Sequence, residues 1–498
     1  MIFTLLLLSI QNPVSVIAAD RIHLGDGQVL GPAFITLENG KVKSIEEGTP
    51  PQGAIHIANA ELTPGLVDAY SFLGVNIGGY TVDESRESGA SQRLSETANL
   101  DHEAFQNAVR NGVTSAFLSP DSANVFGGLA AFVKTSGGDS AHVFQKAGTS
   151  ARVLENAAAL KITLGNDAAN GNHSPWGRPF DYKTRRPTTR MGTVWEIRRQ
   201  FYKALDYKKA KLQGDVETNA DLEVMLQVLD GRLPLRVQAR RSNDVQTALR
   251  LKEEFGFTRM VVEEGTEAWR ARDLLAQAGV AVVTGPAYDD VTRSIATGPT
   301  LKELRALANP IPVCCEGLED PTAAGDLTVE DLAAAGEHND SQGDEHSHGH
   351  LDEHTVAISG LAQDLLLATT APRYDAMLAG SSRNRRGEGD KATPAMPFLL
   401  HQAGVYCALG SAEAHDSALS EASLIHQART AVRWGLDPSL ALAMVTSQAA
   451  ALCGQAGKLG VIAKGLDADL VLWSGDPLAG TSRPLLVIVE GQIAADFR

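Results

Sequence analysis

The sequence predicts an α/β protein: a (β/α)8 or TIM barrel with a small β-sandwich built from the N- and C-terminal segments. The middle of the chain alternates short apolar runs with helical patterns, which is typical of parallel βα units. Both ends contain only short strand-like runs separated by glycine and proline. We count about seven to eight βα units, the number that a closed barrel needs.

The sandwich is expected to combine residues 21–63 with residues 456–498. Asn39-Gly40 separates two strand-like runs in the first segment and is a strong hairpin signal. The barrel is expected to occupy the residues between the two sandwich segments, 64–455. Its expected strands are Leu66–Val67, Val113–Phe117, Leu160–Leu164, Leu235–Val237, Arg259–Val262, Val280–Val283 and Val405–Leu409.

Helices are expected between these strands. A long one covers Val194 to Leu212, and another covers Val245–Phe255 and stops at Gly256. A third begins at Asp437-Pro438, because aspartate caps a helix N-terminus and proline suits the first helical position.

Composition and charge limit the class of protein. The chain has 498 residues and a net charge of −16, which argues against a nucleic-acid partner. Residues 1–20 contain a short apolar run followed by small residues and are expected to be a signal peptide; the alternative is a buried first strand. The expected location is therefore periplasmic or secreted. No other run is long enough for a membrane span, so none is expected after signal removal.

Residues 317–356 interrupt the barrel pattern. They are rich in Asp, Glu, Gly and Ala, a composition that predicts a disordered acidic insertion rather than a core. His346, His348 and His350 alternate along it and could form a weak, unselective site for zinc, copper or nickel. The alternative is a solvated acidic tether.

Two runs carry a resemblance to a known family. Residues 63–74 read TPGLVDAYSFLG, which resembles the first barrel strand of the amidohydrolase superfamily, in its imidazolonepropionase-like branch. Residues 460–471 read GVIAKGLDADLV and are similar to the family's C-terminal sandwich segment. The resemblance covers nearly the whole chain. It implies a metal-dependent enzyme that hydrolyses carbon–nitrogen bonds other than peptide bonds.

The resemblance also shows where the metal ligands should stand. In this chain those positions hold Tyr70, Phe72, Gln238, Arg240, Glu264 and Ala412. Tyr, Phe, Gln and Ala do not replace imidazole as donors, and Arg240 adds a positive charge that opposes a cation. We therefore predict a degenerate member, a pseudoenzyme without a metal centre. No cofactor is expected in the barrel, and zinc or another divalent metal only if the site is rebuilt.

Other residues could carry chemistry in place of a metal. The catalytic candidates are Glu264, Glu413 and Lys161; Glu263 and Asp416 could join Glu264 and Glu413 at the barrel mouth as acid and base. Alternatively, Glu264 pairs with Arg240 or Arg241, and this ion pair fills the space that a metal ion would occupy in an active relative. Lys134 and Lys161 could bind an anion or pair with carboxylates. His173 and His415 are proton-shuttle candidates or solvated loop residues.

Three functions remain open from the sequence. The first is a non-catalytic protein that binds a small-molecule ligand or supports an active relative. The second is an active hydrolase with a rebuilt metal site or metal-free carboxylate chemistry. The third is a metal-binding protein that works through the histidine tract. A homo-oligomer is an inference from the resemblance.

Overall fold

The computed structural model describes residues 15–75, 81–83, 85–138, 150–169, 185–214, 216–285, 393–411 and 423–498. Several positions that the sequence singles out lie outside these residues: Ala412, Glu413, His415, Asp416, His173 and the insertion 317–356 with its histidines.

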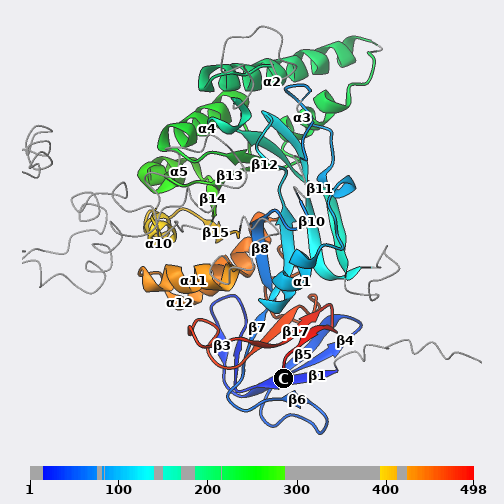
Figure 1. Cartoon of the computed structure of the whole chain (residues 1–498), viewed down its shortest axis with the longest axis vertical. Helices are drawn as coiled ribbons and strands as arrows, with labels where there is room; N and C mark the ends of the chain where they lie inside the picture. Colours follow the sequence, from blue (N-terminus) through cyan, green and yellow to red (C-terminus); the bar gives the residue numbers. More distant parts are fainter. Residues whose placement is uncertain are drawn as a thin grey trace, which may run out of the picture.

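Eight strands of the described chain form the barrel sheet (Figure 1). In spatial order they are β15 (Cys407–Leu409), β14 (Ala281–Thr284), β13 (Met260–Glu264), β12 (Leu235–Gln238), β11 (Ser150–Thr163), β10 (Phe126–Gly138), β9 (Val113–Leu118) and β8 (Leu66–Ser71). Each predicted barrel strand matches one of these elements. The prediction of an α/β barrel is therefore confirmed.

One strand differs from the predicted pattern of parallel βα units. β10 runs antiparallel to both β9 and β11, whereas the other neighbouring strands pair in parallel. The long strands β10 and β11 thus pair as antiparallel neighbours inside the sheet. β10 is not among the seven strands expected from the sequence, and an apolar run carries no information on strand direction, so neither the strand nor its reversal was predicted.

The two ends of the sheet approach each other at a glycine. Gly410 directly follows β15, and a Cβ atom built on it would lie 2.5 Å from the Cβ of Tyr70 in β8. Only a residue without a side chain permits this approach. The barrel is therefore nearly closed at this point.

Helices cover the barrel on the outside. The described helices are α1 (Glu103–Arg110), α2 (Arg190–Gln213), α3 (Ala220–Leu229), α4 (Ser242–Phe255), α5 (Arg272–Ala278), α10 (Met396–Gln402), α11 (Leu424–Arg433), α12 (Pro438–Met444) and α13 (Ser447–Leu452), with short 3-10 helices η1 (Leu94–Glu96), η2 (Asp167–Ala169) and η3 (Ala268–Ala271). The predicted caps are confirmed. The Asp437 side chain accepts hydrogen bonds from two backbone N–H groups of α12, and Gly256 ends α4 in the left-handed conformation.

Both chain ends build the sandwich, as the sequence predicts. One sheet contains β5 (Lys41–Glu47), β4 (Ala33–Glu38), β1 (Val16–Ala19) and β6 (Ile55–His56), and the other contains β18 (Gln492–Asp496), β17 (Pro484–Val489), β16 (Leu470–Trp473), β7 (Glu61–Pro64), β2 (Arg21–His23) and β3 (Val29–Leu30). β7 from the N-terminal part pairs with β16 from the C-terminal part. The predicted hairpin turn joins β4 and β5, with Asn39 and Gly40 both at positive φ.

The boundary at the start of the sandwich differs from the prediction. β1 lies within residues 1–20, the range expected to be a signal peptide, and it pairs with both β4 and β6. The sandwich therefore includes Val16–Ala19 rather than starting at residue 21, in agreement with the alternative of a buried first strand.

A buried lysine joins the barrel to the sandwich. Lys134 of β10 is fully buried, and its Nζ contacts the carboxylates of Asp467 and Asp469, just before β16. Of the two roles left open for Lys134, the structure shows pairing with carboxylates at this junction. It does not place Lys134 among the residues at the strand ends of β12 and β13.

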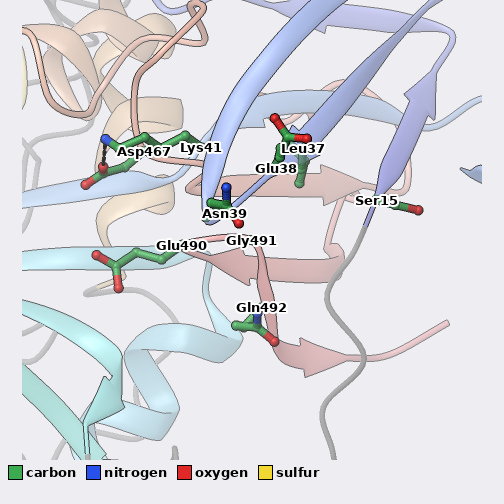
Figure 2. Close-up of a pocket in the computed structure, with 10 residues that line it drawn as sticks. Ser15, Leu37, Glu38, Asn39, Lys41, Asp467, Glu490, Gly491 and Gln492 are labelled. Atoms are coloured by element: carbon green, nitrogen blue, oxygen red, sulfur yellow. Dashed lines mark hydrogen bonds and ion pairs between the residues drawn. The ribbon is translucent and has the colours of Figure 1, made fainter.

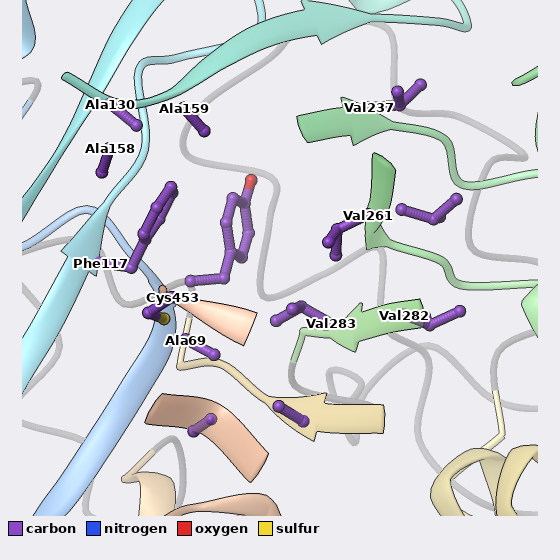
Figure 3. Close-up of a cluster of buried hydrophobic side chains, with 14 of the residues drawn as sticks. Ala69, Phe117, Ala130, Ala158, Ala159, Val237, Val261, Val282, Val283 and Cys453 are labelled. Atoms are coloured by element: carbon purple, nitrogen blue, oxygen red, sulfur yellow. The ribbon is translucent and has the colours of Figure 1, made fainter. Parts of the chain in front are cut away.

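A large cluster of buried apolar side chains includes residues of all eight barrel strands. Figure 3 shows small side chains around Phe117 of β9, among them Ala69 of β8, Ala130 of β10 and Ala159 of β11.

Candidate functional site

The C-terminal ends of the barrel strands bring most of the predicted site residues together. Tyr70 comes from β8, Lys161 from β11, Gln238 from β12 and Glu264 from β13. Each of these side chains is at most 1% exposed. In barrels of this class, ligands bind at this end of the strands, which makes it the candidate site.

Glu264 lies at the centre of a buried polar network. Its Oε1 accepts a hydrogen bond of 2.5 Å from the Tyr70 hydroxyl, and its Oε2 accepts one of 3.3 Å from Gln238 Nε2. The Arg240 guanidinium donates to the same carboxylate through Nε. On its other side, Arg240 Nη2 lies 2.7 Å from Asp167 Oδ2. One guanidinium is therefore held between two buried carboxylates.

The backbone of Glu264 is unusual and aims its side chain. Its φ is 66°, in the left-handed region that non-glycine residues rarely adopt, and Gly265 follows with φ 48°. In a regular strand the adjacent residues Glu263 and Glu264 would face opposite sides of the sheet. The left-handed residue at the strand end allows both carboxylates to face the barrel interior. Such strain persists only where surrounding contacts hold it.

Glu263 forms a second polar group with a lysine. Lys161 Nζ lies 3.4 Å from Glu263 Oε2 and donates a 3.0 Å hydrogen bond to Ser119 Oγ. The Ser119 hydroxyl is 3.2 Å from the same Glu263 oxygen. Lys161 Nζ also lies 5.0 Å from the centre of the Tyr70 ring, a cation–π distance. The lysine is thus paired with a carboxylate inside the barrel.

Arg236 of β12 is a second cation beside Glu263, on the carboxylate oxygen that Lys161 does not contact. Its Nη1 is 3.6 Å from Glu263 Oε1, and its guanidinium carbon lies 4.1 Å from the centre of the Phe117 ring. Arg236 also donates a 3.0 Å hydrogen bond to the carbonyl oxygen of Leu452. Two cations therefore flank the one carboxylate.

Asp68 of β8 forms a separate buried contact. Its carboxylate accepts hydrogen bonds from the hydroxyl and the backbone N–H of Ser411, at 2.5 and 2.9 Å. Burial raises the pKa of Asp68 to about 6, although the hydrogen bonds from Ser411 and from the N–H of Tyr70 act to lower it.

The structure decides between alternatives that the sequence left open. Glu264 pairs with Arg240, as one alternative predicted, and Lys161 pairs with Glu263. Sequence reasoning missed Asp167, Ser119 and Arg236. A polar residue just after a strand was the available signal for Asp167 and Ser119, and Arg236 gave none because it stands inside an apolar strand.

The donor set does not fit a catalytic divalent metal. At the positions where the resemblance puts ligands, the described residues offer a phenol, a phenyl ring, an amide, a guanidinium and one carboxylate. A guanidinium cannot lose its proton to become a ligand. Within the described ranges, no cluster of three or more His, Cys, Asp or Glu side chains is arranged to hold a metal ion.

A surface pocket lies on the sandwich, far along the chain from the barrel site. It has a volume of about 590 Å³ and lies between the β4–β5 turn and the segment 490–492 (Figure 2). Lys41 in this pocket donates a 3.1 Å hydrogen bond to Asp467. Figure 2 shows Glu38 and Glu490 apart from this pair. The lining includes no residue of the barrel network, so this pocket is separate from the candidate site.

Comparison with known proteins supports one family. The model of the amidohydrolase family matches residues 325–494. An amidohydrolase, tasK, of Hapsidospora irregularis is 23% identical over 97% of this chain, which spans only 42% of that relative's length. The crystal structure of an amidohydrolase from Thermotoga maritima is 23% identical, with a TM-score of 0.67 and coverage of 97% of this chain and 99% of that one.

No helix in the described part of the chain combines the length and the apolar character that crossing a membrane requires.

Proposed function

We propose that this chain, which belongs to the amidohydrolase superfamily, is a member whose barrel does not perform metal-dependent hydrolysis and serves as a ligand-binding or scaffolding protein. The observation that carries the proposal is the Arg240 guanidinium held between Glu264 and Asp167. Arg240 and Glu264 both stand where the resemblance expects metal ligands.

Electrostatics supports this interpretation. The buried carboxylates of this barrel need positive charge nearby, since an isolated buried charge is costly. Arg240 compensates Glu264 and Asp167, and Lys161 compensates Glu263. Fixed protein cations thus do in this chain what a bound metal ion does in a metal-dependent barrel. A divalent cation beside Arg240 would also meet direct repulsion.

A metal analysis tests the proposal. We would purify the full chain without an affinity tag and measure bound transition metals by mass spectrometry, together with a variant that lacks residues 337–354. We expect the shortened protein to contain far less than one metal per chain, since the barrel offers a guanidinium where ligands should stand. About one tightly bound metal per shortened chain would overturn the proposal.

The same two proteins separate the alternatives. Metal that is bound only when residues 337–354 are present would indicate the histidine tract, with His346, His348 and His350, as a weak metal site. Both proteins would next be screened for hydrolysis of amides and lactams with and without added zinc. Turnover without metal that is lost in Lys161→Met would support metal-free carboxylate chemistry, because Lys161 contacts Glu263 directly.

We also propose that the chain is exported and that the apolar leader is removed. Because β1 begins at Val16 and pairs with β4, we expect cleavage before that residue, with the mature chain keeping β1. The intact mass of the protein recovered from its native cells would show this. A mature chain that begins after Ala19 would mean that β1 is not part of the working protein.

A further inference from the structure

The outer face of α2 exposes an unusual concentration of large hydrophobic side chains. Nine large hydrophobic residues are exposed in the described chain, and four of them lie on this one helix: Met191, Trp195, Tyr202 and Leu212. Met191 and Leu212 are 85% and 84% exposed, and the two aromatic residues about half. Figure 1 shows α2 at the outer edge of the barrel, at the end of the molecule away from the sandwich. A patch of this kind marks an interaction surface.

The spacing of these residues fits a partner helix. The seam of α2, defined as residues 191, 195, 198, 202, 205, 209 and 212, advances by alternating steps of four and three, with Arg198 and Leu205 half-buried and the others exposed. This is the spacing of the a and d positions of a heptad repeat, which packs one helix along another. The opposite face of α2 is used inside the molecule, where Phe201 packs against Phe126, Phe255 and Phe257.

We propose that the seam of α2 is a homodimer interface, in which α2 packs antiparallel against α2 of a second copy of this chain. A twofold axis near Tyr202 would place the two Tyr202 rings together. Met191 would then meet Leu212 of the second copy, and Trp195 would meet Lys209 of the second copy. The first pair is apolar, and in the second the aliphatic part of the Lys209 side chain can pack against the indole ring. A parallel arrangement would instead bring Arg198 against Arg198 and Lys209 against Lys209.

The two aromatic side chains are already held in place. The guanidinium carbons of Arg186 and Arg199 lie 5.7 and 5.4 Å from the centre of the Trp195 ring, within cation–π distance. The Tyr202 ring packs edge-on against Phe255 at 5.1 Å, and its hydroxyl donates a 3.0 Å hydrogen bond to Glu254. Trp, Tyr and Arg dominate binding hot spots, and side chains that are already ordered lose less entropy on association.

Local ion pairs remove an obstacle to self-association. α2 is rich in basic residues, and two copies of an uncompensated basic helix would repel each other. Six of these residues form ion pairs with carboxylates on α2 itself or on neighbouring elements: Arg190 with Asp244, Arg198 with Glu254, Arg199 with Glu196, Lys208 with Asp230, Lys209 with Asp206, and Lys211 with Glu223. The two charged residues of the seam, Arg198 and Lys209, and the basic residues beside it are therefore compensated within each copy.

Sedimentation of the full chain tests the interface. We expect a dimer at concentrations of about 1 to 50 µM, and dissociation when Trp195→Glu and Tyr202→Glu are combined, with the dissociation constant raised at least about 100-fold. The matched control is Leu274→Glu on α5, since Leu274 is also a large exposed hydrophobic residue at 45%. Circular dichroism would confirm that all variants fold. A monomeric native chain, or a double variant that stays dimeric, would overturn the proposal.

Cross-linking tests the antiparallel register separately. A Tyr202→Cys variant should form a covalent dimer on mild oxidation, because two residues beside a twofold axis can satisfy disulfide geometry. The pair Met191→Cys and Leu212→Cys in one chain should also cross-link between copies. Leu274→Cys is the control and should not. Failure of both seam variants to cross-link in a protein that sediments as a dimer would place the interface elsewhere.

Discussion

Replacing Arg240 with methionine should destabilise the fold by about 3–5 kcal/mol, the usual effect of removing one partner of a buried ion pair. Arg240 is 1% exposed, and its guanidinium contacts the carboxylates of Glu264 and Asp167. Without it, two buried carboxylates lose their shared positive charge. Urea unfolding of native and variant proteins would measure the loss.

Two further variants show whether the effect comes from the ion pair. Adding Glu264→Gln to Arg240→Met should recover part of the loss, because the amide is neutral and can still accept the hydrogen bond from Tyr70. Arg232→Met is the surface control, since Arg232 is 65% exposed in its pair with Asp230, and such pairs contribute little. If Arg240→Met were as stable as Arg232→Met, the network would not hold the strand ends together.

A large loss of stability in Arg240→Met would also support the proposed function. The left-handed backbone of Glu264 can persist only if its side-chain contacts compensate the strain. A network that stabilises the barrel would explain how these strand ends keep several buried carboxylates and still fold. The charges that compensate its buried carboxylates are then part of the chain itself.

Local signals made much of the fold predictable from sequence. Asn39-Gly40 predicted a hairpin because both residues tolerate positive φ, and Asp437-Pro438 predicted a helix start because of capping. These signals depend on neighbouring residues alone. The direction of β10 depends instead on where its two neighbours lie in space, and no feature within its apolar run specifies that.

The candidate site was predictable in its positions and only partly in its contacts. The resemblance placed Tyr70, Gln238, Arg240 and Glu264 at strand ends, and charge suggested that Glu264 pairs with an arginine. Tyr70 and Glu264 are 194 residues apart, so their hydrogen bond follows from barrel closure rather than from any local pattern. Asp167 was missed because a single acidic residue after a strand resembles an ordinary loop residue.

Replacing Asp68 with asparagine should make the protein more stable at neutral pH, by up to about 3 kcal/mol. Burial raises the pKa of Asp68 to about 6 in the folded protein, whereas an unfolded aspartate titrates near 3.9. Between about pH 4 and pH 6 the folded state therefore binds the proton that the unfolded state has released. The free energy of unfolding falls as the pH rises through this window, and the loss is complete above it.

Asparagine cannot ionise, so the free energy of unfolding of the Asp68→Asn variant should not fall as the pH rises through this window. Its carbonyl oxygen can accept from the backbone N–H groups of Tyr70 and Ser411, and the Ser411 hydroxyl can rotate to accept from the new amide. Urea unfolding from pH 4 to pH 8 should show the native and variant proteins converging at the acidic end and separating at the neutral end.

A second aspartate provides a control of opposite sign. The hydrogen bond from Lys208 lowers the pKa of Asp230 in the folded protein, so Asp230→Asn should lose stability, and only above the pH at which that carboxyl ionises. If Asp68→Asn were less stable than the native protein at pH 8, the charged form of Asp68 would be required in the barrel. The buried contact between Asp68 and Ser411 would then belong with the ionised carboxylates of the candidate site and would not be a neutral part of the core.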